Sequence, residues 1–320
     1  MDENRRTTTY EGRSLPRPAE ELVDQGLGFD VGTLLSRRRL LAVLGLGAAG
    51  AGLAACGGTS ASSESSAAAA SSTATAAAGE IPDETAGPYP GDGSNGPDVL
   101  EQSGIVRSDI RSSFGESSGT AEGVPMTLEL TVRDLANGGV PFAGVAVYVW
   151  HCDRDGGYSM YSEGITDQNY LRGVQIADAA GTVRFTSVFP ACYSGRWPHI
   201  HFEVYPDQDA ITDAANVIAT SQVALPQDVC DAVYATSGYA SSVRNLAQVG
   251  LTTDNVFGDD GGASQLATVT GDAAGGYTVA LPVGIDPTTT PTGGGLGGDG
   301  APSGAPGGPG GGRPPGTPPN

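Results

Sequence analysis

Short β-strands are the elements that the hydrophobic pattern predicts along the middle of the chain. Residues 125–134 (PMTLELTVRD) alternate apolar and polar side chains, which is typical of a strand with one buried face. Residues 144–152 (GVAVYVWHC) are rich in β-branched and aromatic residues, which also favour strands. Further strands are predicted at 182–188, 199–205, 217–225, 265–271 and 276–283. Gly, Pro, Asp and Asn separate these segments and predict turns between them.

This succession of short strands and turns predicts an all-β fold, an antiparallel β-sandwich with irregular loops and little helix. One short helix is predicted around 226–236, with Pro226 at an early helical position. The sequence contains neither the glycine pattern of a dinucleotide-binding fold nor a P-loop.

Composition divides the 320 residues into four segments. Residues 1–55 are predicted to be an export signal, and residues 56–80, rich in Ser and Ala, a flexible tether. Residues 81–286 are predicted to form one folded domain of about 200 residues. Residues 287–320 are rich in Gly and Pro without a collagen period, which predicts disorder.

The export signal consists of a basic segment and an apolar one. SRRRLL at 36–41 precedes the uncharged run at 40–55, which is shorter than a membrane-spanning helix requires. The Arg37-Arg38 pair resembles a twin-arginine signal. The LAAC sequence that ends at Cys56 resembles a lipobox, which implies cleavage before Cys56 and its lipidation. An ordinary signal peptide with a coincidental cysteine is the alternative. We therefore expect a protein anchored by lipid to the outer face of the cytoplasmic membrane, or secreted.

The net charge of −20 excludes nucleic acid as a partner. All 16 basic residues are arginines, and no basic stretch follows a phosphate backbone. The acidic surface indicates solubility rather than a specific cationic partner.

Three cysteines lie beyond Cys56, at Cys152, Cys192 and Cys230. They can form one disulfide in three ways, and an oxidising compartment favours one. We expect a Cys192–Cys230 bridge, with Cys152 buried as a small hydrophobic residue.

Two of the three histidines stand one residue apart, in YSGRWPHIHFEVY at 193–205. On a strand, His199 and His201 point to the same side while Ile200 and Phe202 face the other. Two imidazoles on one face can bind one metal ion. An isolated H-x-H pair is also compatible with ordinary packing.

The neighbouring residues favour a hard metal. Tyr193 can ligate as a phenolate, a hard anionic donor that suits Fe(III) better than Zn²⁺ or Cu⁺. Arg196 keeps its charge and presents a planar fork of donors. Upstream, Tyr158 follows a Gly-Gly turn and, taken alone, is compatible with a turn residue.

Several ordered motifs together resemble the intradiol ring-cleaving dioxygenases, a family of non-haem Fe(III) enzymes. The motifs are ETAGPYPG (84–91), RSDIR (107–111), VYVWHCDRDGGYSMYS (147–162), NYLRGVQIAD (169–178), GTVRFTSVFPACYSGRWPHIHFEVY (181–205) and TSQVALP (220–226). They cover nearly all of the predicted domain, and they resemble most closely the exported, single-domain branch.

The resemblance implies a ligand set and a reaction. Tyr158, Tyr193, His199 and His201 match the four iron ligands. Arg196 matches the arginine beside the metal, with a catalytic role that the match also gives to Tyr193. Gln222 matches the glutamine near the substrate, and an ordinary strand residue is its alternative. The implied cofactor is one Fe(III) ion. The implied reaction inserts both atoms of O₂ into a catechol and gives a muconate-type diacid.

Other readings remain open at this point. A non-catalytic β-sandwich binding module, or the same chemistry on a larger polyphenol or lignin-derived substrate, would also fit. Tyr161, Tyr170 and Trp197 can form aromatic walls of the substrate pocket or support the site by packing. We expect a monomer or a small homo-oligomer.

Overall fold

The computed structural model describes residues 9–10, 13–14 and 79–292. In the N-terminal part, β1 (Thr9–Tyr10) and β2 (Arg13–Ser14) pair antiparallel. Cys56, the arginine pair and residues 293–320 lie outside the described residues, so the predicted signal, tether and tail stay predictions. Within the described residues, no helix combines the length and the apolar character needed to cross a bilayer.

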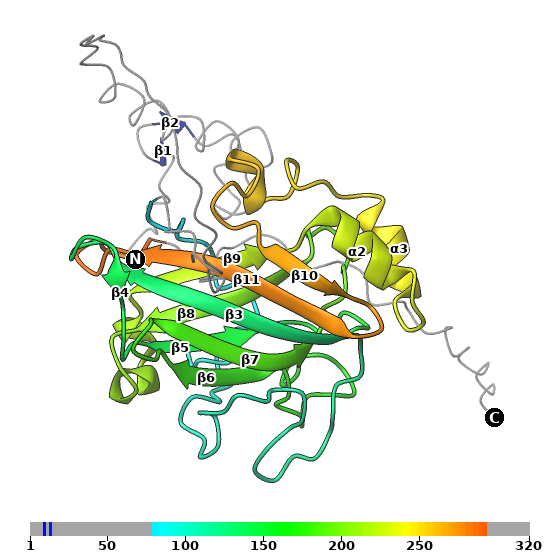
Figure 1. Cartoon of the computed structure of the whole chain (residues 1–320), viewed down its shortest axis with the longest axis horizontal. Helices are drawn as coiled ribbons and strands as arrows, with labels where there is room; N and C mark the ends of the chain where they lie inside the picture. The colour runs from blue at the N-terminus through cyan, green and yellow to red at the C-terminus, as the bar shows by residue number, and fades with distance from the viewer. Residues whose placement is uncertain (1–8, 11–12, 15–78, 293–320) are drawn as a thin grey trace, which may run out of the picture. The chain divides into compact units, whose positions relative to one another are not determined.

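Two β-sheets form the body of the domain (Figure 1). The first sheet contains β3 (Pro125–Asp134), β4 (Val140–Pro141), β7 (Thr182–Val188), β10 (Thr268–Asp272) and β11 (Gly276–Ile285). The second has the order β6 (Arg172–Ile176), β5 (Ala146–Trp150), β8 (His199–Tyr205) and β9 (Ala219–Ala224). The predicted all-β sandwich is confirmed.

One pair of neighbouring strands departs from the predicted antiparallel arrangement. β11 runs parallel to β3, with Tyr277 opposite Met126 and Ile285 opposite Asp134. All other strand pairs of the two sheets are antiparallel. A parallel neighbour requires a long connection back to the same end of the sheet. Alternation along each strand gives no information about such a connection.

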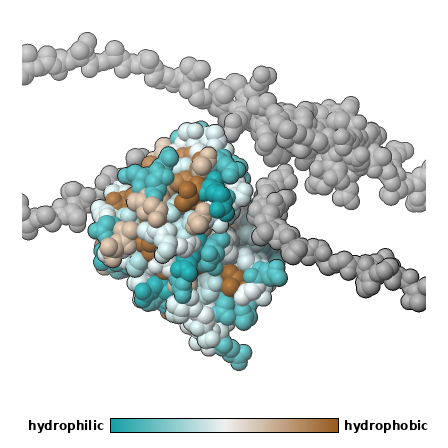
Figure 2. Space-filling model, turned by 90° about the vertical axis from the view of Figure 1, so that its right-hand side faces the viewer, coloured by the Kyte–Doolittle hydropathy of each residue, from teal (hydrophilic) through white to brown (hydrophobic). Residues whose placement is uncertain are grey.

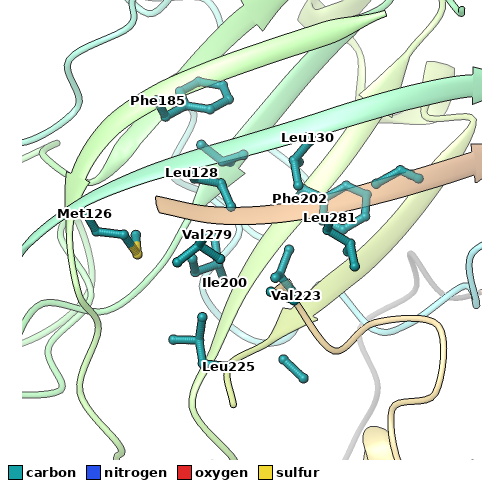
Figure 3. Packing of buried hydrophobic residues seen from close by; sticks show 14 of the residues in the cluster. Met126, Leu128, Leu130, Phe185, Ile200, Phe202, Val223, Leu225, Val279 and Leu281 are labelled. Atoms are coloured by element: carbon teal, nitrogen blue, oxygen red, sulfur yellow. The ribbon is translucent and has the colours of Figure 1, made fainter. Parts of the chain in front are cut away.

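The core lies between the two sheets (Figure 3). Along β3, every second side chain is buried, and Met126, Leu128 and Leu130 point inward. Ile200 and Phe202 of β8 contribute to the same apolar cluster and are 0% exposed. Burying one such side chain fully contributes about 1.5–3 kcal/mol. This packing fixes the position of β8 and therefore of the histidines on its opposite face.

Two α-helices follow β9. The predicted helix is α2 (Gln227–Tyr234), which begins directly after Pro226 at the N-cap. It buries Cys230, Val233 and Tyr234, spaced as one helical face. The second helix, α3 (Ala240–Leu246), was not predicted, and its single strongly apolar buried residue, Leu246, explains why no periodic pattern announced it. Short 3₁₀ turns are η2 (Asp209–Thr212), η3 (Ala214–Asn216) and η4 (Phe257–Asp259).

The predicted Cys192–Cys230 disulfide is wrong for this structure, because all three described cysteines are free and buried. The Cys192 thiol lies 3.5 Å from the carbonyl oxygen of Arg196, and the Cys152 thiol 3.6 Å from that of Ala191. Burial raises the pKa of Cys192 to about 12. The thiols therefore remain protonated in the absence of a cation and pack as small buried groups.

An irregular segment at residues 80–91, here called the entry segment, lies across the ends of both sheets. The Ile81 amide donates to the Gly284 carbonyl at the end of β11. The Glu84 amide donates to Thr220 of β9, and the Ser221 hydroxyl donates to the Pro82 carbonyl. These hydrogen bonds place the entry segment next to the polar face of β8.

Candidate metal centre

The two histidines of β8 bring their outer ring nitrogens together. His199 Nε2 and His201 Nε2 are 3.1 Å apart, and both side chains are buried. His199 Nδ1 donates to the Trp197 carbonyl, so its Nε2 carries a lone pair. His201 stacks on Trp150 of the neighbouring strand, with ring centroids 4.9 Å apart. The strand register thus holds two imidazoles in one converging orientation, as the sequence predicts.

Tyr193 joins this pair from the loop before β8. Its phenolic oxygen lies 3.2 Å from His199 Nε2. The helix that sequence analysis missed holds this loop: Ser242 of α3 accepts from the Cys192 amide, and Asn245 donates to the Cys192 carbonyl. Both backbone groups of the residue before Tyr193 are thereby fixed by α3.

Tyr158 reaches the same place from a tight turn after β5. The Asp153 carboxylate accepts from the amides of Asp155 and Gly157, and Gly156 has φ +92°, a conformation that favours glycine. A Cβ at Gly156 would lie 3.3 Å from the Cβ of Tyr193, so the two tyrosine loops are in contact. The Tyr158 and Tyr193 rings meet edge to face with centroids 5.9 Å apart.

Burial keeps all four of these side chains neutral without a cation. It lowers the pKa of His199 to about 3 and that of His201 well below the usual range. It raises the pKa of Tyr193 to about 12 and that of Tyr158 further, with Tyr193 close to Tyr158 adding to the effect. A bound cation would reverse the preference of the phenols by favouring the phenolates.

One unsatisfied atom of the site fits a metal ion. Tyr158 Oη is among six buried polar side-chain atoms of the described chain that have no hydrogen-bond partner, and it lies beside the converging histidines. Such orphaned groups are costly unless something completes them. No three His, Cys, Asp or Glu side chains in residues 79–292 form a metal-binding group. A cation here would therefore depend on phenolate oxygens together with the two imidazoles, a set that suits Fe(III).

Arg196 lies beside these four donor side chains, and its own partners were not predicted. Its Nε donates to Asp254 at 2.9 Å, and its Nη2 donates to Gln222 at 2.7 Å. Asp254 is completely buried and also accepts from the Trp197 amide at 2.7 Å. Sequence reasoning missed Asp254 because it lies in an irregular segment 58 residues from Arg196.

Gln222 lies beside Arg196, and its place near a substrate stays a prediction. It stands opposite His201 in the β8–β9 pairing and is 0% exposed. Its amide nitrogen donates to the Thr85 carbonyl of the entry segment, while its oxygen accepts from Arg196. Both ends of the amide are used, so Gln222 links Arg196 to the entry segment.

The entry segment covers His201 and Tyr158. A Cβ at Gly87, which has φ +71°, would lie 3.4 Å from His201 Cε1. The ring of Tyr89 lies 4.8 Å from that of Tyr158, centroid to centroid. The motif at 84–91 was recognised in the sequence, but no single residue of it was singled out. Its glycine permits the backbone to approach an imidazole closely.

Arg172 ties the entry segment to the Tyr158 turn. Its guanidinium donates to the carbonyls of Tyr89, Pro90 and Ser159, and also to the hydroxyls of Ser159 and Tyr148. It is 1% exposed, and the bonds use all five of its N–H groups. Arg172 is therefore a support of the site and has no donor left for a ligand.

The three candidate wall residues support loops instead. Tyr161 accepts from the Gly91 amide, and the Tyr170 hydroxyl donates to Asp153. The Trp197 indole donates to the Leu225 carbonyl within the core. Of the two alternatives left open by the sequence, support by packing is the one that the contacts favour.

Comparisons with known proteins identify relatives of part of this chain. Residues 95–201 match a family model described as "Dioxygenase". A catechol 1,2-dioxygenase of Pseudomonas sp. (strain EST1001) is 43% identical over 72 residues, which are 22% of this chain and 23% of that protein. A chlorocatechol 1,2-dioxygenase of Rhodococcus opacus is 38% identical over 63 residues, 20% of this chain and 24% of that protein. The chain thus spans about a quarter of the length of these curated relatives.

A solved structure shares the fold over most of its length. The intradiol ring-cleavage dioxygenase of Tetranychus urticae is 23% identical, with a TM-score of 0.52, and the match covers 66% of this chain and 96% of that one. The described domain therefore has the fold of such an enzyme. The matched family model and the relatives are similar to this chain over parts of the same domain, and they support a relation to the intradiol ring-cleavage dioxygenases.

Proposed function

We propose that the chain is an Fe(III)-dependent intradiol dioxygenase that cleaves catechol-type rings between the two hydroxyl-bearing carbons. The observation that carries the proposal is the convergence on His199 Nε2 of two other donors, the Tyr193 hydroxyl at 3.2 Å and His201 Nε2 at 3.1 Å. Tyr158 adds a buried phenol without a partner beside them. Two imidazoles and two phenolates would hold one ferric ion, which when bound supplies Lewis-acid binding of a catecholate and its activation towards O₂.

The protein's own groups prepare the substrate. A deprotonated Tyr158 or Tyr193 is a base inside the site and would accept a proton from a catechol hydroxyl. Because the histidines are neutral, they add no positive charge to the site. The negative charges of the phenolates and of the substrate oxygens would therefore offset the positive charge of the metal ion. Arg196 would stabilise the negative charge that develops on the substrate. Its guanidinium is fixed in advance by Asp254 and Gln222, so little reorganisation is needed.

The surroundings restrict access of water. Trp150, Tyr158 and Phe257 are at most 2% exposed, and Gly87 and Tyr89 cover the site from the entry segment. A dry site strengthens each electrostatic interaction in it.

The spectrum of the purified protein tests the proposal. Ferric protein should show a tyrosinate-to-iron charge-transfer band in the visible region, and anaerobic addition of catechol should shift it. On admission of air, the ring should open to a muconate-type diacid. A protein that stays colourless after ferric reconstitution, and leaves catechol intact, would instead be a binding module or would use another metal.

Export and lipid attachment form a separate part of the proposal. The arginine pair at 37–38 and the LAAC sequence ending at Cys56 support it. The Cys56→Ala variant should move from the membrane fraction to the soluble fraction, and mass spectrometry should find the lipid only on the wild-type cysteine. Equal membrane recovery of both proteins would contradict the anchor while leaving the ring-cleaving proposal intact.

A further inference from the structure

Tyr193 depends on distant segments for its position, whereas Tyr158 is held locally. The Tyr158 amide donates to the Ser162 hydroxyl at 2.9 Å, and the Ser162 amide donates back to the Tyr158 carbonyl. After Tyr193, the exposed residues Ser194 and Gly195 form an open turn, and a Cβ at Gly195 would meet no atom within 4 Å. The contacts that support Tyr193 therefore lie on the side of the residues that precede it.

The helices α2 and α3 hold the loop that leads to Tyr193. At the end of α2, the Tyr234 hydroxyl donates to the Pro190 carbonyl at 3.1 Å. At the N-cap of α3, the Tyr239 hydroxyl donates to the Phe189 carbonyl at 2.8 Å. Both of these tyrosines are buried. Two successive carbonyls of the loop are thus bound by the helix pair.

Cys192, directly before Tyr193, is bound through three of its groups. Its amide donates to the Ser242 hydroxyl at 3.0 Å, and its carbonyl accepts from the Asn245 side-chain amide at 2.8 Å. Its thiol donates to the Arg196 carbonyl at 3.5 Å. Ser242 is 0% exposed. Because the peptide groups on both sides of Cys192 have a partner in α3, neither can rotate without losing a hydrogen bond. The helix therefore fixes the direction in which the chain enters Tyr193.

The opposite side of the loop contacts the turn that carries Tyr158. The Ala191 amide donates to the Asp153 carbonyl at 3.1 Å. A Cβ at Gly156 would lie 3.3 Å from the Cβ of Tyr193. The loop is thus enclosed between α3 and the turn. If the bonds to α3 were lost, the turn would support the loop from one side only.

The outward side of the helix pair differs from the inward side. In Figure 1, α2 and α3 lie at the right, and Figure 2 turns this side of the molecule towards the viewer. Hydrophilic and neutral residues predominate there, and hydrophobic ones occur as small separate groups. Ser241 and Gln248 are exposed, whereas the neighbouring Ser242 is buried and Asn245 half-buried. The same short segment therefore offers a serine and an amide on each side.

We propose that Ser242 and Asn245 are positioning residues for Tyr193, which act through the backbone of Cys192 and determine how firmly the site retains iron. This inference rests on the proposed ring-cleaving function. Loss of both bonds would leave two backbone groups of Cys192 without partners. The Tyr193 phenol would then no longer be held 3.2 Å from His199 Nε2. Residues that orient metal ligands typically change metal affinity by about 10–100-fold.

The test uses the full, iron-loaded protein with Ser242→Ala and Asn245→Ala combined. The tyrosinate-to-iron band should shift, because the orientation of one of the two phenolates changes. Transfer of iron to an excess of chelator, followed by the decay of the band and by metal analysis, should become about tenfold faster. The matched control combines Ser241→Ala and Gln248→Ala, which changes the same residue types on the exposed side. This control should keep the band and the transfer rate of the wild type.

Tyr234→Phe separates positioning from stability. It removes a buried hydrogen bond between the helix pair and the loop, but the bond is to Pro190 and not to Cys192. This variant should lower the midpoint of thermal unfolding of the iron-free protein and leave the band and the transfer rate unchanged. Asn245→Ala alone, at a half-buried position, should change the band and the rate in the same direction as the double variant, by a smaller amount. It decides the question should the double variant fail to fold.

The outcomes distinguish the two levels of the proposal. A wild-type protein that shows no band with ferric iron would overturn the proposed function and, with it, this inference. A wild type with the band, together with variants of Ser242 and Asn245 that match the exposed control, would overturn only the inference. Iron transfer that is equally fast in Tyr234→Phe would show general loosening of the helix pair and would also overturn it.

Discussion

The two faces of β8 are equally buried but differ in what burial requires of them. All seven residues of the strand are buried. Ile200 and Phe202 pack into the core between the sheets, whereas His199, His201 and Glu203 occupy the opposite face. Apolar side chains need only well-filled volume, but each buried polar group also needs a partner. Burial alone therefore does not distinguish the core from the site.

The polar groups at and near this face differ in whether they have partners. Glu203 accepts from the Tyr205 hydroxyl at 2.9 Å, and His199 donates to a backbone carbonyl. His201 Nδ1 and Tyr158 Oη have no partner at all. Trp150 Nε1 and Thr220 Oγ1 of the same sheet also lack a partner, so an unpartnered atom alone does not mark the site. The site is distinguished instead by the convergence of His199 Nε2, His201 Nε2 and the Tyr193 hydroxyl beside the unpartnered Tyr158 phenol.

Removing a proposed metal ligand from the polar face of β8 should have the largest effect on activity. His201→Ala should reduce ring cleavage by at least about 10³-fold, because both iron affinity and the coordination of the substrate depend on it. Iron content by metal analysis and the visible band should fall together. A variant with full iron and full activity would disprove the ligand assignment.

Removing the neighbour on the apolar face should affect stability instead. Phe202→Ala should lower the free energy of unfolding by about 3–5 kcal/mol, because the core would have to close a large cavity. Denaturant unfolding of the iron-free protein measures this loss. His201→Ala should cost less in the same experiment, since it removes an imidazole with an unpaired nitrogen. Equal losses from the two variants would contradict the functional distinction between the two faces.

The next prediction concerns Arg196, whose guanidinium lies beside the proposed metal ligands. Arg196→Lys should keep iron but lower kcat by about 10²–10³-fold, because a lysine cannot bind Asp254 and Gln222 at once. Arg184→Lys is the matched control, since Arg184 contacts Glu129 at the surface of the other sheet. Wild-type turnover of Arg196→Lys would remove Arg196 from the mechanism.

The smallest expected effect concerns the entry segment at the rim of the polar face. Burial, with Asp259 nearby, raises the pKa of Glu84 from 4.5 to about 7. The folded state therefore favours the protonated carboxyl, and the contribution of Glu84 to stability is present below pH 4.5 and lost as pH rises through 7. Because the group is partly exposed, screening reduces this loss to about 1 kcal/mol.

Glu84→Gln provides the measurement. The free energy of unfolding of this variant relative to the wild type should increase by about 1 kcal/mol between pH 4.5 and pH 8. Asp272→Asn at an exposed hairpin serves as the control. A difference between Glu84→Gln and the wild type that does not change with pH would show that Glu84 ionises normally.

Much of the fold was predictable because the strands alternate cleanly. The segments 125–134, 182–188 and 199–205 coincide with β3, β7 and β8. β6 was not predicted as a strand, since RGVQI contains an arginine and a glutamine in place of a clear alternation. Arg172 is nevertheless buried there, because loop carbonyls from distant segments satisfy its donors.

The sequence by itself determined the chemistry and its local presentation. Alternation of period two places His199 and His201 on one face whatever surrounds them, and the tyrosines carry the anionic donors. Residue types and their spacing in the motifs therefore predicted a ring-cleaving dioxygenase before any contact was known.

Only the tertiary structure decided what those donors meet. Asp254, Gln222 and Thr85 come together with Arg196 through contacts between segments from 26 to 137 residues apart. The helix α3 and the Tyr193 loop also meet only in the folded chain. Such contacts depend on how loops close over the sheets, and no local periodicity encodes that closure. For this reason, the charge balance around Arg196 could be derived only from the folded domain.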